Sequence, residues 1–128
     1  MFLSLKNQRW LLIGLGGFFG GGLRAVVEHL LQSDAPLGTL LINWTGVFVS
    51  VLLTEILVKH WSVWQQWHAD FLSIGLIGAY TTYSTALLEM SQQAFVPAII
   101  YWCLSIIGGV LIALAAQVCA RWIRGAQK

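Results

Sequence analysis

The polar residues of this sequence that could act chemically stand inside long uncharged segments. One such run is Gly75-Leu-Ile-Gly78-Ala-Tyr80-Thr81-Thr82-Tyr83-Ser84-Thr85. A cluster of hydroxyl groups without a carboxylate, amine or imidazole suits the binding of ions and does not suit hydrolysis. Serine and threonine can bond back to helix carbonyls, so a continuous helix is one interpretation. The density of these residues favours a helix broken at its centre, whose freed carbonyls can bind a cation and whose amides and hydroxyls can bind an anion.

A second set of polar or small residues lies in the preceding hydrophobic segment and shares one helix face: Asn43, Gly46, Ser50 and Thr54. Their spacings of three, four and four residues keep them on that face. Two interpretations stay open, because such a stripe can pack helices together or line a path for a solute. Asn43 favours the path, since an amide inside a membrane needs either a partner or a permeant species.

The first hydrophobic segment is rich in glycine, with two overlapping GxxxG patterns among Gly14, Gly16, Gly17, Gly20, Gly21 and Gly22. Glycines at this spacing predict close approach between helix backbones. Arg24 follows them, and it either pairs with Glu28 four residues later or faces a vestibule that attracts anions. The two roles are compatible. In the last segment we interpret Ser105, Gly108 and Gly109 as packing residues.

The elements that must position these residues are long apolar helices. The chain has 128 residues, of which 58% are hydrophobic and 9% are charged, against about a quarter charged in soluble domains. This composition excludes a disordered protein, a nucleic-acid-binding arm and an ordinary cytosolic enzyme. We predict one all-α membrane domain over residues 1–128, with four transmembrane helices at 10–31, 37–58, 71–88 and 94–120. Five tryptophans fall near the expected span ends, as in an interfacial belt: Trp10, Trp61, Trp64, Trp67 and Trp122.

Three motifs, in order, give the sequence a family resemblance over nearly its full length. Residues 16–24 look like GGxxGAxxR, residues 38–48 look like GTLxxNxxGxF, and residues 75–89 look like GxxGGxTTFSTFSxE. The chain therefore resembles the CrcB/Fluc fluoride channels.

The resemblance implies a fluoride-selective channel that exports F⁻ across the cytoplasmic membrane, built as an antiparallel dimer with two pores along the interface. It implies a structural sodium ion held by the main-chain carbonyls of Gly78 and Thr81. The fluoride pathway would be lined by Asn43, Tyr83, Ser84, Thr85 and Arg24. Fluoride, sodium, lipid and a second subunit are then the expected partners, with no nucleic acid.

The sequence departs from the family pattern at the two phenylalanines expected to line the pores. Tyr83 keeps a ring and adds a hydroxyl, whereas Ala86 removes the ring and Leu87 replaces a serine. These changes favour a second interpretation, a non-conducting or half-functional subunit of a heterodimeric fluoride channel. A small multidrug exporter is a weaker alternative, since such proteins need a carboxylate deep in the first helix and no acidic residue precedes Glu28. No pair or cluster of groups suited to catalysis lies within a span, so we expect no enzyme.

The distribution of basic residues predicts the orientation. Four spans put six basic residues on the face that carries both termini: Lys6, Arg9, Lys59, Arg121, Arg124 and Lys128. The opposite face has at most Arg24, so we expect both termini in the cytoplasm. An antiparallel homodimer requires dual topology, which this bias opposes. We therefore predict a heterodimer with an oppositely oriented homologue, and the homodimer is the alternative.

Overall fold

Hydrophobic segments of this length form helices, and all the regular elements of the described chain are helical. The computed structural model describes residues 5–31, 36–58 and 65–126. Its elements are α1 (Leu5–Leu31), α2 (Leu37–Leu53), η1 (Thr54–Val58), α3 (Gln66–His68), η2 (Ala69–Ile77), α4 (Gly78–Tyr80), α5 (Ser84–Ser91) and α6 (Phe95–Gly125). The labels η1 and η2 mark wider, π-helical turns.

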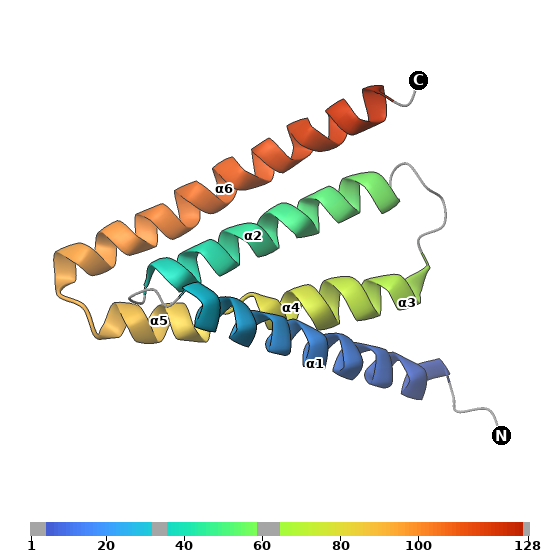
Figure 1. Ribbon diagram of the computed structural model, residues 1–128, viewed down its shortest axis with the longest axis horizontal. Helices are drawn as coiled ribbons and strands as arrows, with labels where there is room; N and C mark the ends of the chain where they lie inside the picture. The colour runs from blue at the N-terminus through green and yellow to red at the C-terminus, as the bar shows by residue number, and fades with distance from the viewer. Residues whose placement is uncertain (1–4, 32–35, 59–64, 127–128) are drawn as a thin grey trace.

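Four stretches of these elements are long and apolar enough to cross a membrane: Gln8–Leu31, Leu37–Leu57, Gln66–Ser91 and Phe95–Gly125. The prediction of an all-helical chain is confirmed for the described residues, and so is the prediction of four helices that could span a membrane by length and composition. α6 lies beside α2, and α1 lies beside η2 and α4. α1 begins at the same end of the bundle at which α6 ends (Figure 1), as four sequential spans require.

Glycines bring α1 against η2. A Cβ atom built on Gly16 would collide with the Phe71 carbonyl oxygen, and one on Gly20 would collide with that of Leu76. A Cβ on Gly75, from the opposite side, would lie 2.7 Å from the Ile13 carbonyl oxygen. The prediction of close backbone packing is therefore confirmed for these glycines, whereas Gly21 has open space around it.

The third hydrophobic helix begins at Gln66, before the expected residue 71, because Asp70 is not a loop residue. The Asp70 side chain is wholly buried and accepts hydrogen bonds from Arg9 Nε at 2.8 Å and Arg9 Nη2 at 3.0 Å. Gln66 Nε2 donates to the same carboxylate at 3.1 Å. A carboxylate whose charge is met by a guanidinium and an amide can lie inside the helix pair.

The fourth hydrophobic helix also runs beyond the expected residue 120, and it includes Arg121 and Arg124. Arg124 Nη1 pairs with Glu55 Oε2 at 3.2 Å, which joins the end of α6 to η1. Asp70 and Arg124 therefore lie within helices because a partner from another helix meets each charge.

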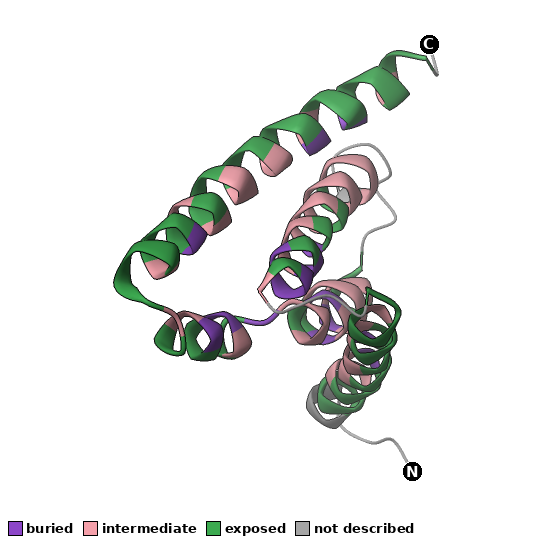
Figure 2. Ribbon diagram, turned by 60° about the vertical axis from the view of Figure 1, so that its left-hand side comes forward, coloured by how far each residue is buried: buried purple, intermediate pink, exposed green. Residues whose placement is uncertain are grey.

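Much of the apolar surface of α1 and α6 faces outward (Figure 2). Phe18 and Trp122, for example, are among the most exposed large side chains. An outward apolar face is expected where a helix contacts lipid or another membrane protein. Trp10 and Trp67 are also exposed, as an interfacial belt requires, while Trp61 and Trp64 lie outside the described residues.

Candidate ion-binding site

Residues 81–83 lie between α4 and α5 and are not helical. The backbone of Thr81 is extended, with φ of −78° and ψ of 153°, although its N–H still donates to the Ile77 carbonyl at 3.0 Å. In a continuous helix the next amide, that of Thr82, would donate to the Gly78 carbonyl. It donates instead to Asn43 Oδ1 on α2, at 2.8 Å.

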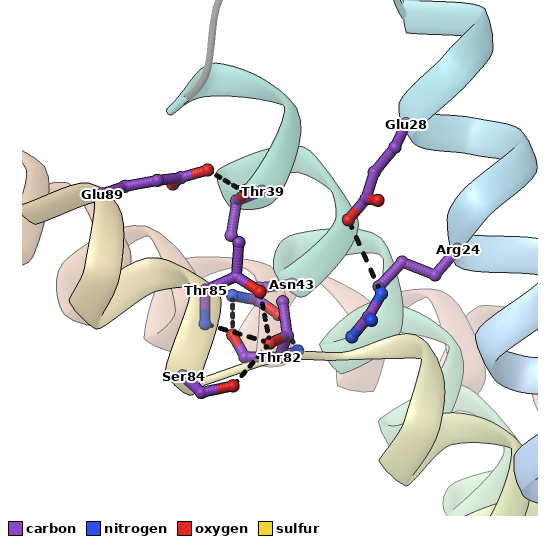
Figure 3. A network of polar contacts seen from close by, with 8 residues as sticks. All are labelled: Arg24, Glu28, Thr39, Asn43, Thr82, Ser84, Thr85 and Glu89. Carbon is purple, nitrogen blue, oxygen red and sulfur yellow. Dashed lines mark hydrogen bonds and ion pairs between the residues drawn. The ribbon is translucent and has the colours of Figure 1, made fainter.

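Asn43 completes this link by donating from Nδ2 to the Thr82 carbonyl oxygen at 2.9 Å. One side-chain amide thus satisfies both main-chain groups of Thr82 (Figure 3). These two hydrogen bonds explain why an asparagine can lie here among apolar residues, because buried peptide groups that leave the helical pattern need other partners. It also holds the non-helical segment against α2.

Three hydroxyl side chains gather around the same segment (Figure 3). Thr82 Oγ1 donates to Thr85 Oγ1 at 3.0 Å and lies 3.5 Å from Ser84 Oγ. It also accepts a bond from the Thr85 N–H at 3.3 Å, in the first turn of α5. The structure therefore brings together Asn43, Ser84 and Thr85, which the sequence analysis named, with Thr82, whose position in the same hydroxyl run was the available signal.

A hollow of about 270 Å³ opens beside this cluster, and it is lined by Asn43, Trp44, Val47, Thr81, Thr82, Tyr83, Ser105 and Gly109. The lining carries amide, hydroxyl and indole groups and no carboxylate. Tyr83 belongs to this lining and is 75% exposed. Ser105 and Gly109, which the sequence analysis interpreted as packing residues, belong to this lining, whereas Gly108 does pack, against the indole of Trp44.

Arg24 lies apart from the hollow. Its Nε is 3.5 Å from Glu28 Oε1, one turn along α1, so the predicted pairing is confirmed (Figure 3). Both side chains stay partly exposed. The predicted anion-attracting vestibule stays a prediction.

Glu89, the acidic residue that ends the third motif, is buried and hydrogen-bonded to two other helices. Thr39 Oγ1 donates to Glu89 Oε1 at 2.6 Å, and the Tyr101 hydroxyl donates to Oε2 at 3.3 Å. A carboxylate that accepts two hydroxyl donors ties α2, α5 and α6 together. In the sequence, only two features pointed to this contact: Glu89 belongs to the third motif, and Thr39 belongs to the second.

Comparison with known proteins decides the family. The model of the family described as CrcB-like protein, Camphor Resistance (CrcB), matches residues 11–117. The chain belongs to the CrcB family. It is 34% identical over 120 residues to fluoride-specific ion channel FluC 2 of Geobacillus kaustophilus, covering 88% of this chain and 92% of that protein. It is 36% identical over 122 residues to FluC 1 of Leifsonia xyli subsp. xyli, covering 90% of this chain and 85% of that protein.

A third relative is the fluoride-specific ion channel FluC of Nautilia profundicola. It is 32% identical over 119 residues, covering 85% of this chain and 91% of that protein. The expectation that the chain is not an enzyme is confirmed, because it belongs to a family whose relatives reported above are named ion channels. The four helices that could cross a membrane agree with a multi-pass membrane protein.

The residues that the CrcB resemblance implies for sodium binding have main-chain carbonyl oxygens that could coordinate a cation. Because the Thr82 amide bonds to Asn43, the carbonyl of Gly78 is released from its usual helical partner. The extended ψ of Thr81 turns a second carbonyl out of the helical direction. Carbonyl oxygens suit a hard cation, and no cluster of acidic, histidine or cysteine side chains within the described ranges offers another metal site.

The two positions at which this chain departs from the CrcB pattern have different surroundings. Tyr83 is exposed at the hollow, whereas Ala86 is 7% exposed and lies in the core cluster with Leu40 and Tyr101. Trp44 also packs against this cluster. The small residue at position 86 therefore faces the interior of the subunit, where a larger ring would compete with aromatic side chains already present.

Proposed function

We propose that this chain forms a fluoride-selective channel that exports F⁻ across the cytoplasmic membrane. The observation that carries the proposal is the cluster of Asn43, Thr82, Ser84 and Thr85 beside the hollow, in a CrcB-family chain. The relatives named as fluoride-specific channels support the same ion.

The chemistry of the cluster suits fluoride. A small, strongly hydrated anion gives up its water only where close donors replace it, because uncompensated desolvation of a charge is costly. The Asn43 amide carries two hydrogens and gives one to Thr82, which leaves a second for an anion. Ser84, Thr85 and the Tyr83 hydroxyl supply further donors, and Arg24 would attract the anion toward the entrance. A larger halide gains less from such closely placed donors.

The functional assembly in this proposal is an antiparallel dimer with two pores at its interface and a break in the third helix at residues 81–83. Main-chain carbonyls of Gly78 and Thr81 from both subunits would hold a structural sodium ion at the centre. Sodium there would neutralise carbonyl dipoles that meet at the interface. The outward apolar faces of the helices are compatible with a second subunit.

A second candidate is a subunit that conducts only in a heterodimer with an oppositely oriented homologue. The imbalance of basic residues favours it, because six stand on the face of the termini and at most one on the other. Of these, Lys59 and Lys128 lie outside the described residues, and nothing is described of the Lys6 side chain. The alanine at position 86, which also suggested this candidate from the sequence, does not separate the two, because it lies in the core of the subunit.

The test is fluoride efflux from liposomes that contain only this chain, measured with a fluoride electrode after a concentration jump. The channel proposal predicts rapid efflux of fluoride with little efflux of chloride. Efflux only after co-reconstitution with an oppositely oriented homologue would support the heterodimer. No fluoride efflux in either preparation would refute the channel.

The sodium proposal and the orientation have separate tests. Exchanging sodium for N-methylglucamine during purification should lower efflux and thermal stability, and a structure in sodium without density among the Gly78 and Thr81 carbonyls would refute the site. Reporters fused to the C-terminus, each active on one side of the membrane, should report only from the cytoplasm. Equal reporting from both sides, with conduction by this chain alone, would refute the heterodimer.

A further inference from the structure

The indole N–H of Trp44 is a hydrogen-bond donor without an acceptor in the described part of the chain. Its ring lies between α2 and α6 and lines the hollow beside Asn43. The Nε1 atom is buried and makes no hydrogen bond within the described part of the chain. A buried donor without a partner is destabilising and calls for an explanation, such as a water or an ion.

Gly108 makes the position of this ring possible. A Cβ atom on Gly108 would collide with Cζ2 and Cε2 of the indole and would lie 2.9 Å from Nε1. The nitrogen-bearing edge of the ring therefore rests directly on the backbone of α6. Any larger residue at position 108 would push that edge away.

The chemistry of the unpaired group restricts what could satisfy it. An indole N–H donates and cannot accept, so its partner is an acceptor such as a water oxygen or an anion. The hollow beside the ring is lined by the Asn43 amide and the Ser105 hydroxyl, and its lining contains no carboxylate. The Ser105 hydroxyl makes no hydrogen bond to any described residue. The surroundings favour an anion.

We infer that the Trp44 indole N–H is an additional hydrogen-bond donor for fluoride in the hollow, acting with Asn43. This inference rests on the proposed channel function. Fluoride in the hollow, which the Trp44 ring lines, would meet an N–H that no acceptor in the described part of the chain already occupies. The ion would then gain a donor, and the indole would lose the penalty of an unpaired N–H.

The direct test is a fluoride titration of the full chain in lipid nanodiscs, with the tryptophan indoles labelled with ¹⁵N. The resonance of Trp44 is identified as the one lost in Trp44→Phe, or by elimination with the other six tryptophans if that variant does not fold. Its proton should shift downfield with fluoride and should not shift with equal chloride. The indole of Trp102, exposed on α6, is the matched control and should not respond.

A functional test changes each side of the contact between Trp44 and Gly108 in turn. Trp44→Phe keeps a ring and removes the donor, and it should lower the ratio of fluoride to chloride efflux by roughly tenfold, the effect of one lost hydrogen bond. Gly108→Ala displaces the indole edge and should lower the ratio in the same direction. Trp102→Phe should leave the ratio unchanged.

The outcomes separate this inference from the function on which it rests. If the wild-type chain conducts fluoride and the Trp44 resonance does not respond to saturating fluoride, the inference is wrong and the channel stands. An equal response to chloride also overturns it. If the wild-type chain binds and conducts no fluoride, alone or with an oppositely oriented homologue, the proposed function itself fails.

Discussion

Replacing Asn43 tests how the non-helical segment is held. Asn43→Leu keeps the branched outline of the side chain and removes both hydrogen bonds to the Thr82 main chain, of 2.9 and 2.8 Å. The substitution leaves both main-chain groups of Thr82 without a partner, and each such group away from water costs about 1–3 kcal/mol. Because the site is only partly buried, the lower part of that range applies, and the free energy of unfolding should fall by about 2–4 kcal/mol.

The assay is equilibrium unfolding of the purified chain in mixed micelles, followed by circular dichroism, together with fluoride efflux. Asn43→Asp is an informative companion, because its carboxylate still accepts from the Thr82 amide while the donor to the carbonyl is lost. It should unfold between wild type and Asn43→Leu, and its added negative charge should block fluoride. Thr54→Val is the control, since that exposed hydroxyl donates to the Ser50 carbonyl one turn earlier and to no other group in the described part of the chain.

Fluoride efflux should be abolished in Asn43→Leu, while the proposed dimer should persist on size-exclusion chromatography. Wild-type unfolding in Asn43→Leu would refute the idea that this amide anchors the segment. Wild-type efflux in the same variant would remove Asn43 from the fluoride pathway.

Three further predictions follow from the packing of the helices. Thr39→Val removes the 2.6 Å donor to the buried Glu89 carboxylate and should lower the free energy of unfolding by about 1.5–3 kcal/mol, measured in the same micelles, whereas the exposed Thr54→Val should not. Gly20→Val should cost about 1–3 kcal/mol by overpacking α1 against η2, and Gly21→Val, in open space, should be neutral; equal effects would contradict the contact. Arg9→Gln should lower the thermal midpoint, because the Asp70 carboxylate keeps the Gln66 donor but loses its countercharge. Adding Asp70→Asn should recover most of the loss; no recovery would mean that Arg9 acts independently of Asp70.

The hydrophobic pattern determined the class of the fold without help from tertiary contacts. A helix that crosses a bilayer needs about 20 apolar residues, so segment length alone predicts four such helices. Local spacing also predicted the close contacts of Gly16 and Gly20 and the pairing of Arg24 with Glu28, because residues three or four apart share a helix face. The three motifs were sufficient to identify the CrcB family.

The ends of the helices and the partners of the polar groups depended on the tertiary structure. The sequence places Asp70 before the third span, whereas in the structure Arg9, 61 positions away, neutralises it inside the helix pair. The sequence indicates that the Asn43 amide needs a partner but does not identify it, and the structure supplies Thr82, 39 positions away. Glu89 and Ala86 owe their burial to α2 and α6 in the same way. Periodicity reports which face of a helix a residue occupies, whereas the free energy of a buried polar group depends on a partner brought by another helix, and no local pattern encodes that partner.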